Sequence, residues 1–148
     1  MADRRFAPVA AYNGRVQMPQ RKTAFSAGYD LAAAAETVVE PGRVALVPTG
    51  LKAYMEPDEV LLLTIRSSLA AKRGLMLANG VGVIDADYVD NPDNEGHILV
   101  AMVNVGGTPV PISCGERIAQ GLFVKYLTTT DDAAGSSRQG GFGSTGSR

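Results

Sequence analysis

The sequence predicts an all-β sandwich or barrel with one short helix. Several short segments are rich in Val, Leu and Ile, and they are separated by turn-forming stretches: EPGR at 40–43, GGTP at 106–109 and SCGE at 113–116. Short strands with a turn about every 8 to 12 residues are typical of sandwiches and barrels. The strands are expected at residues 44–47, 51–55, 60–65, 81–84, 97–104 and 117–126.

Residues 67–74, SSLAAKRG, are the exception and predict one or two turns of helix. Hydroxyl side chains open the segment, good helix formers follow, and two late basic residues precede a final glycine. Because the segment follows the strand at 60–65 directly, its free N–H groups and positive dipole suit an anion. Ordinary N-capping by Ser67 or Ser68 is the alternative interpretation. The alanine run at 32–35 indicates tight packing, with a helix tendency that flanking strands override.

The length and the net charge of the chain limit the classes of function that it can have. A chain of 148 residues is expected to form one domain with a single core. Its 14 Lys and Arg residues against 15 Asp and Glu give a net charge of -1. No broad basic field therefore exists for binding nucleic acid or an anionic membrane, and any phosphate must be held locally.

The cysteine count, the apolar runs and the single histidine indicate where the protein is located and whether it holds zinc. Cys114 is the single cysteine and cannot form an intrachain disulfide, and the first ten residues lack the apolar stretch of a secretory signal. We therefore expect a reducing cytoplasm. The longest apolar run, at 60–65, is far shorter than the roughly 20 residues that cross a bilayer. His97 has no second His or Cys at metal-ligand spacing, so we expect a loop or surface histidine and no zinc site.

From Thr128 onward apolar side chains become rare, which predicts a β domain at 1–127 and a flexible arm at 128–148. The arm ends in GGFGSTGSR, whose glycines fit the spacing of a phosphate-binding loop. A dinucleotide fingerprint needs a strand before it and a helix after it, and a Walker loop needs Lys after its last glycine, so both are excluded. Arg138 and the lone aromatic Phe142 favour a lid over a nucleotide. A disordered Gly/Ser tail is the alternative.

The stretch GVIDADYVD at 82–90 holds the acids Asp85 and Asp87. We expect the two acids to point to opposite faces, with Tyr88 on the side of Ala86 unless the strand ends first. No shared dyad is therefore expected. One acid can face a cleft while the other meets a surface cation, and a turn with solvated acids is the alternative.

Three further stretches carry polar candidates. Arg66, with the hydroxyls of Ser67 and Ser68, offers phosphate ligands at the entrance of the expected helix. Asp30 lies between a Tyr and a buried-looking Leu in AGYDL. Gln120 stands in the middle of the apolar strand GERIAQGLF, where its amide either satisfies a neighbouring backbone group or faces a ligand.

Five stretches in order resemble the five ordered motifs of the trimeric deoxyuridine triphosphatase family. They are AGYDL, RSSLA, GVIDADY, GERIAQ and RQGGFGSTG, and they span residues 27 to 146. The resemblance implies a jelly-roll-like β subunit and a homotrimer with three active sites at subunit boundaries, each drawing on more than one chain. It also implies Mg²⁺-dependent hydrolysis of dUTP to dUMP and pyrophosphate, which limits uracil in DNA and supplies dUMP for thymidylate synthesis.

The resemblance implies a role for each matched residue. Asp85 matches the acid that orients and deprotonates the water attacking the α-phosphorus. Tyr88 matches the aromatic under the deoxyribose, where close packing rejects a 2′-hydroxyl, and Asn79 matches the amide that reads uracil in a hairpin too tight for the thymine methyl. Asp30 matches an acid associated with metal-bound water, with Mg²⁺ held mainly by the triphosphate. Further substrate contacts are implied at Arg66, Ser67, Ser68, Val83, Gln120, Arg138, Phe142, Gly143, Ser144 and Thr145.

Two features depart from the family pattern. Ser68 stands where the family usually has Gly, and RSS at this position also resembles the related dCTP deaminases, which share the fold. After Tyr88 the chain runs VDNPDNEG, which suggests an inserted surface loop of about five residues rich in turn formers. We expect the loop at 89–96 to leave the chemistry unchanged, although it can reshape one mouth of the site or a contact between subunits.

Two other functions stay open. A dCTP deaminase would need groups that activate water at C4 of the pyrimidine, and its family has a different acid-bearing segment and lacks this aromatic glycine tail. A catalytically idle nucleotide-binding or protein-binding trimer of the same fold would have no need of Asp85, Arg138 and Phe142 together.

Overall fold

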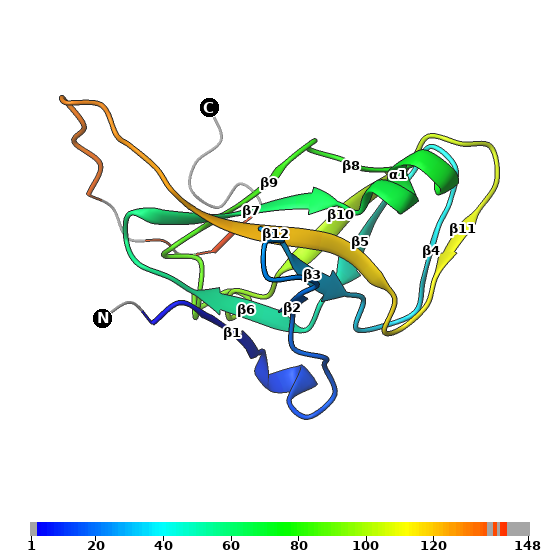
Figure 1. Ribbon diagram of the computed structural model, residues 1–148, viewed down its shortest axis with the longest axis horizontal. Helices are drawn as coiled ribbons and strands as arrows, with labels where there is room; N and C mark the ends of the chain where they lie inside the picture. The colour runs from blue at the N-terminus through cyan, green and yellow to red at the C-terminus, as the bar shows by residue number, and fades with distance from the viewer. Residues whose placement is uncertain (1–2, 136–137, 139, 142–148) are drawn as a thin grey trace.

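The computed structural model describes residues 3–135, 138, 140 and 141 of the chain. The all-β prediction is confirmed: the described residues form twelve strands and one short α-helix, with one 3-10 turn (Figure 1). The helix α1 spans Ser67–Arg73, and the turn η1 spans Ala10–Tyr12. The strands are β1 (Arg5–Pro8), β2 (Gln20–Arg21), β3 (Tyr29–Ala32), β4 (Thr37–Val39), β5 (Val44–Pro48), β6 (Leu51–Tyr54), β7 (Glu59–Ile65), β8 (Leu75–Leu77), β9 (Gly82–Asp85), β10 (Leu99–Asn104), β11 (Val110–Ile112) and β12 (Arg117–Lys125).

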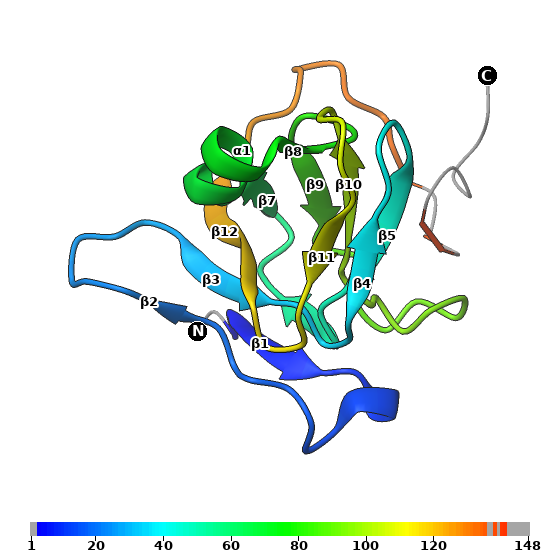
Figure 2. The same ribbon diagram turned by 90° about the vertical axis from the view of Figure 1, so that its right-hand side faces the viewer.

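The strands pair antiparallel in four sheets. One sheet has five strands in the order β2-β3-β12-β7-β9, another has three in the order β5-β10-β8, and the pairs β1-β6 and β11-β4 complete the set. Figure 2 shows β3 and β12 on one side of the molecule and β4 and β5 on the other. Two core clusters connect these layers: one joins β12 to β4, β5, β8, β10 and β11, and the second joins β3 and β7 to β6.

The ladder between β7 and β12 is the longest that the structure describes. All seven residues of β7, Glu59–Ile65, have antiparallel partners on β12. The other edge of β7 pairs with β9, which sets Asp85 opposite Val60. At the centre of the ladder a Cβ on Gly121 would come within 3.0 Å of Leu61 Cδ1. The close packing of this sheet against its core therefore favours glycine at that position.

The helix α1 begins directly after β7, as the sequence predicts, and ends at Gly74, whose φ of 66° lies in the left-handed region. Leu69 is the buried residue that anchors it to the core. The interpretation of a serine cap is wrong. Arg66 occupies the N-cap position with no side-chain hydrogen bond there, and Ser67 and Ser68 are exposed in the first turn.

Strands with longer apolar runs are confirmed, whereas six short strands lie outside the sequence prediction: β1, β2, β3, β4, β8 and β11. Each has only two to four residues, which is too few for a periodic pattern to be recognised. The alanine run is not helical, since Ala32 ends β3 and Ala33 is buried in the core. The strand expected from residue 97 begins at Leu99, and His97 lies in the preceding loop.

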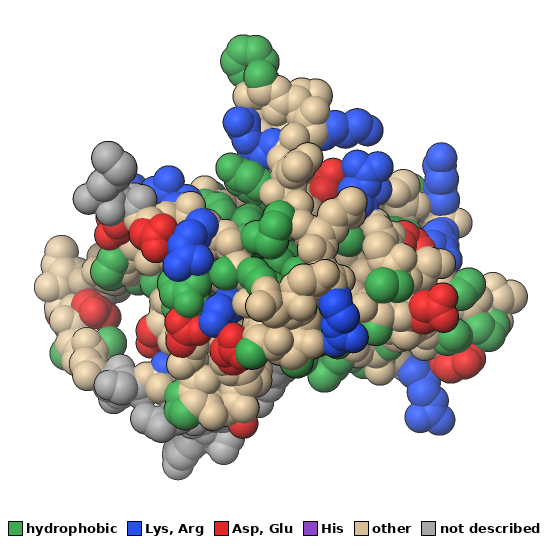
Figure 3. Space-filling model, turned by 90° about the horizontal axis from the view of Figure 1, so that it is seen from below, with side chains coloured by type: hydrophobic (Ala, Val, Ile, Leu, Met, Phe, Trp, Pro, Cys, Tyr) green, Lys and Arg blue, Asp and Glu red, His purple; other side chains and the backbone are tan. Residues whose placement is uncertain are grey.

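Charges on the surface are mixed. Acidic and basic side chains are interspersed on the face seen in Figure 3, in keeping with the net charge of -1. The connection between β2 and β3 projects from the body of the molecule (Figure 2), and Phe25 within it is fully exposed. No helix among the described residues is both long and apolar enough to span a membrane.

Replacing Leu61 with Ala should lower the free energy of unfolding by about 2 to 5 kcal/mol, because the side chain is completely buried and its removal leaves a cavity. Leu62 on the same strand points to the other face of the sheet and is only half-buried, so Leu62→Ala is the matched control and should lose less. Urea unfolding at one protein concentration measures both losses. Equal losses would contradict the assignment of this face of β7 to the core.

Candidate active site

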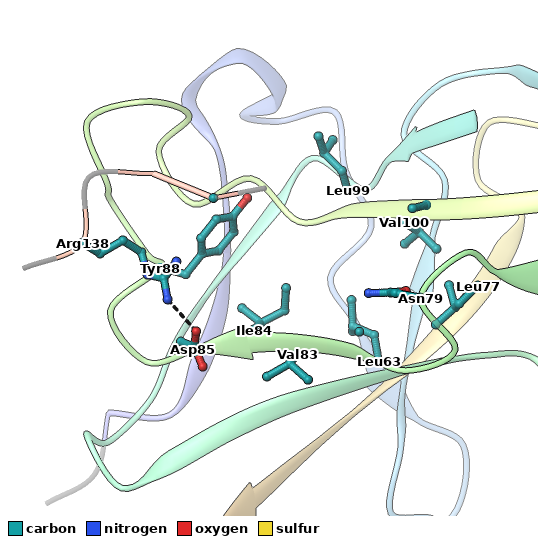
Figure 4. Close-up of a pocket in the computed structure, with 13 residues that line it drawn as sticks. Leu63, Leu77, Asn79, Val83, Ile84, Asp85, Tyr88, Leu99, Val100 and Arg138 are labelled. Atoms are coloured by element: carbon teal, nitrogen blue, oxygen red, sulfur yellow. Dashed lines mark hydrogen bonds and ion pairs between the residues drawn. The ribbon is translucent and has the colours of Figure 1, made fainter. Parts of the chain in front are cut away.

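One cavity of about 250 Å³ lies at the β9 edge of the five-stranded sheet. β9 and β7 line it together with residues of β8 and β10 (Figure 4). Five residues that the sequence singles out line this cavity: Asn79, Val83, Asp85, Tyr88 and Arg138. The other lining residues are Leu63, Leu77, Gly82, Ile84, Leu99, Val100, Ala101 and Gly141.

The two acids of the GVIDADY stretch converge on one cation. Arg138 Nη2 donates to Asp85 Oδ2 over 2.5 Å, and its Nε donates to Asp87 Oδ1 over 2.7 Å (Figure 4 shows the first contact). The expectation that these acids point to opposite faces is wrong: residues two apart on a strand share a face, and both carboxylates reach Arg138 although β9 itself ends at Asp85. The hydrogen bond to Asp87, followed by the charge of both acids, raises the pKa of Arg138. The guanidinium therefore stays charged beside two carboxylates.

Tyr88 forms a buried part of the cavity wall. Its hydroxyl donates to the backbone oxygen of His97 over 2.8 Å and accepts a hydrogen bond of the same length from Asn94 Nδ2. Gly141 lies against the ring, where a Cβ would come within 2.7 Å of Tyr88 Cε1. Burial raises the pKa of Tyr88, so the phenol remains neutral near pH 7.

Asn79 lies in the turn that follows β8, and its side chain points into the cavity (Figure 4). The turn is tight: Gly80, with a φ of 77°, donates its backbone N–H to the oxygen of Leu77. A carboxamide carries both donors and an acceptor, so it can pair with the edge of a base. Val83 is largely exposed on β9 beside it.

A second group of polar residues lies where β3, β12 and β7 meet. β3 and β12 pair Asp30 with Gln120, so the two side chains share one face of the sheet. The carboxylate of Asp30 lies 3.8 Å from Arg66 Nε and 3.5 Å from Arg117 Nη1. Gly28 lies so close to the Gln120 side chain that there is no room for a Cβ. This region therefore combines two guanidinium groups, an amide and one carboxylate.

The second group does not line the cavity at β9. Asp30 and Arg117 border a separate polar hollow, and Arg66, Ser68 and Arg117 border another. Ser67 is exposed at the start of α1. A single chain thus carries the sequence-predicted residues as two spatial groups, one around Asp85 and one around Asp30.

The roles predicted for the residues near the C-terminus stay predictions, because these residues lie outside the described part of the chain: Phe142, Gly143, Ser144 and Thr145. Among the residues that the structure describes, no group of three or more His, Cys, Asp or Glu could hold a metal ion. The sequence reasoning did not single out Arg117, although a basic residue inside the GERIAQ stretch was a usable signal.

His97 lies in a loop as expected but is half-buried. Its Nε2 accepts a hydrogen bond of 2.8 Å from the backbone N–H of Gly50, and its ring packs against Tyr12 with the centroids 5.4 Å apart. Burial lowers the pKa of His97, although the charge of Glu95 opposes the shift. The neutral imidazole is therefore the form that fits this loop, which also supplies the backbone acceptor for Tyr88.

Comparisons with known proteins agree on one family. A family model described as dUTPase matches residues 14–146. The chain is 48% identical over 149 aligned residues to the deoxyuridine 5'-triphosphate nucleotidohydrolase of Lactococcus lactis subsp. lactis, with 99% of both chains covered. It is 43% identical to the protein of the same name from Desulfitobacterium hafniense, covering 88% of this chain and 87% of that protein.

The solved structures most similar to this chain include a crystal structure of the dUTPase from Streptococcus mutans. It superposes with a TM-score of 0.82 at 48% identity, covering 85% of this chain and 98% of that one. A dUTPase from phage phi11 of S. aureus, described with a structural Mg(II) ion, has a TM-score of 0.74 at 21% identity and covers 90% of this chain and 97% of that one. At 21% identity, the similarity to the phage protein indicates a shared fold alone.

Acidification from about pH 7.5 to about pH 5.5 should lower the melting temperature of the wild-type chain more than that of a His97→Gln variant. The folded-state pKa of His97 lies below the ordinary value of 6.5, so the unfolded chain takes up the proton first. The stability contributed by the neutral imidazole is complete above pH 6.5 and is lost as the pH falls through the folded-state pKa. His97 is the single histidine of the chain, and parallel curves of melting temperature against pH would contradict its role.

Proposed function

Because the chain belongs to the dUTPase family, it is a dUTP nucleotidohydrolase, and we propose that Asp85 activates the water that attacks the α-phosphorus of dUTP. The observation that carries this proposal is the position of Asp85, at the end of β9 and on the wall of a cavity that Asn79 and Tyr88 also line. Its carboxylate is about half exposed, so water can reach it. A positioned carboxylate base contributes roughly 10² to 10⁴ to a rate.

The cavity suits the nucleoside part of the substrate. Asn79 offers donors and an acceptor that match the carbonyl and N–H groups of uracil, while Leu63, Ile84 and Val100 provide apolar walls. The Tyr88 ring would lie under the deoxyribose, and its close packing would leave no space for a 2′-hydroxyl. We propose that these contacts select dUTP against nucleotides with a larger base or a ribose.

The group around Asp30 suits the phosphates. Arg66 and Arg117 present guanidinium groups, and Ser67 and Gln120 present a hydroxyl and an amide, which are donors that phosphate oxygens accept. Protein sites usually hold Mg²⁺ through one or two carboxylates plus substrate phosphates. A single carboxylate such as Asp30 fits this pattern, so we propose that Mg²⁺ is held mainly by the triphosphate and that Asp30 acts through water. When bound, Mg²⁺ would neutralise charge on the triphosphate.

An exposed apolar face supports a homotrimer. Val44 and Leu46 on β5 and Met76 on β8 are each about half exposed, and Val103 on β10 stands beside Val44 and Met76 in the sheet. Leu99 on the same sheet lines the active-site cavity. We propose that copies of the chain cover this face, and that the Asp85 group of one subunit then meets the Asp30 group of another.

The C-terminal segment is proposed to close over the site. β12 ends at Lys125, and residues 126–135 after it are exposed. Further along, Arg138 reaches the acids of the cavity, and Gly141 lies on Tyr88. A β domain at 1–127 with an arm at 128–148 is consistent with these contacts, and a chain end can cover a site and release product without disturbing the core.

Asp85→Asn should lower the turnover of dUTP by about 10² to 10⁴, because the amide cannot take a proton from water. Binding of a non-hydrolysable α,β-bridged dUTP analogue should change only a few-fold, since the side-chain shape is kept. Asp87→Asn is the matched control: it also loses a contact to Arg138 but should keep most of the turnover. Pyrophosphate release measures the rate, and turnover of Asp85→Asn at the wild-type level would exclude Asp85 as the base.

Two inactive variants should complement each other if the site is shared between subunits. Arg66→Ala and Asp85→Asn each remove one group of the site, but about one third of the sites in trimers that contain both variants would combine an intact Arg66 with an intact Asp85. Coexpression with two affinity tags and sequential purification gives the mixed trimers, and each variant alone is the control. Mixed trimers that stay as inactive as the single variants would mean that the site belongs to one chain.

A further inference from the structure

Hydrogen bonds join the two limbs of the loop that follows Tyr88. Asp90 N donates to the backbone oxygen of Glu95 over 2.9 Å, and Glu95 N donates to the backbone oxygen of Asn91 over 3.0 Å. Both acids have left-handed backbone, with φ of 57° and 65°. At Gly96 a Cβ would come within 2.6 Å of backbone in the opposite limb of the loop, so the two limbs are in direct contact. The insertion is therefore an ordered element.

Two asparagines fill the inside of the loop. The amide nitrogen of Asn91 donates to the backbone oxygen of Tyr88 and to Asn94 Oδ1, while its Oδ1 accepts from the backbone N–H groups of Asp93 and Asn94. Asn94 Oδ1 also accepts from the N–H of Gly96. With two donors on its oxygen, the Asn94 amide has a fixed orientation, and its nitrogen must face the Tyr88 hydroxyl.

The outer side of the loop is anchored to the body of the protein. Lys52 Nζ on β6 donates to Asp90 over 2.5 Å and to Glu95 over 2.8 Å, and the Tyr54 hydroxyl donates to Asp90 over 2.6 Å. The backbone N–H of Ala10 donates to Glu95. Hydrogen bonds from Lys52 lower the pKa of both acids, which keeps them charged. The acids of the loop thus serve as its attachment points.

These bonds form one directional chain that passes through the hydroxyl of Tyr88. Asn94 donates to the Tyr88 hydroxyl, which in turn donates to the backbone oxygen of His97. Gly141 contacts the edge of the same ring from the arm. Because the hydroxyl is held at the far end of the side chain, the ring cannot tilt or withdraw without breaking both hydrogen bonds.

We propose that Asn94 is a positioning residue that fixes the Tyr88 ring, and that the inserted loop thereby sharpens discrimination between deoxyribose and ribose. This inference rests on the proposed role of Tyr88 under the sugar. Discrimination by packing depends on small displacements, since a contact displaced by an ångström loses much of its effect. Asn94 does not touch the substrate in this scheme and acts through the ring.

The test compares kcat/KM for dUTP and UTP in single and double variants. Asn94→Ala should reduce the preference for dUTP about 3- to 10-fold, the effect expected for one hydrogen bond, with kcat for dUTP nearly unchanged. Asn94→Asp keeps the shape and both acceptor contacts but cannot donate to Tyr88, and the phenol can donate to the new carboxylate only by giving up its bond to His97, so this variant should also lower the preference. Asp93→Ala is the control in the same loop, because its carboxylate makes no hydrogen bond within the described residues, and it should keep the wild-type preference.

A double-mutant cycle separates positioning from general destabilisation. In a Tyr88→Phe background, which lacks the hydroxyl, Asn94→Ala should change the preference less than about twofold. An undiminished effect in that background, or a lowered melting temperature with unchanged preference, would overturn the positioning role. Tyr88→Ala tests the premise separately: if that variant keeps the wild-type preference, the proposed function of Tyr88 itself is wrong. A lost preference in Tyr88→Ala with no effect of Asn94→Ala would overturn only the role of Asn94.

Discussion

The register between β7 and β12 is the constraint on which both groups of site residues depend. β12 carries Gln120 beside Asp30 of the next strand, and β7 leads directly into Arg66, whose N–H bonds to the backbone of β12. The other edge of β7 holds β9 and, at its end, Asp85. Since side chains alternate along a strand, a slip of one residue would turn these groups away from their neighbours. The buried leucines of β7 and the close fit at Gly121 prevent that slip.

The sequence predicts those parts of the fold that are decided locally. Long apolar runs become β7, β10 and β12, and a helix that ends in glycine becomes α1. The short strands could not be predicted in the same way, because most of them pair with segments far along the chain: β4 pairs with β11, more than seventy residues later. The helix starts where the sequence predicts, but its capping residue does not follow the usual preference, since serine is a common cap and Arg66 holds that position here.

The residues of the site were predictable as chemical types, while their arrangement was not. Asp85, Tyr88 and Asn79 meet in one cavity as the motifs imply. Asp85 and Asp87 do not point to opposite faces as expected, because residues two apart on an extended chain share a face, and both acids reach Arg138. In a site for a triphosphate, a cation between the acids limits their repulsion of the substrate. The order of charged residues along the sequence does not reveal that Asp85 and Asp87 bind the same arginine.

The left-handed backbone at Asp90 and Glu95 has a consequence for how the loop can vary. A non-glycine residue in this conformation costs about 1 kcal/mol or more, and glycine would remove that cost. Glycine would also remove the carboxylates that Lys52 holds. The lysine, which bonds to both carboxylates, is therefore the main reason for acidic residues at these positions, with Tyr54 and the N–H of Ala10 adding one partner each. We expect the three positions to covary in related chains, inherited together as one unit or replaced together.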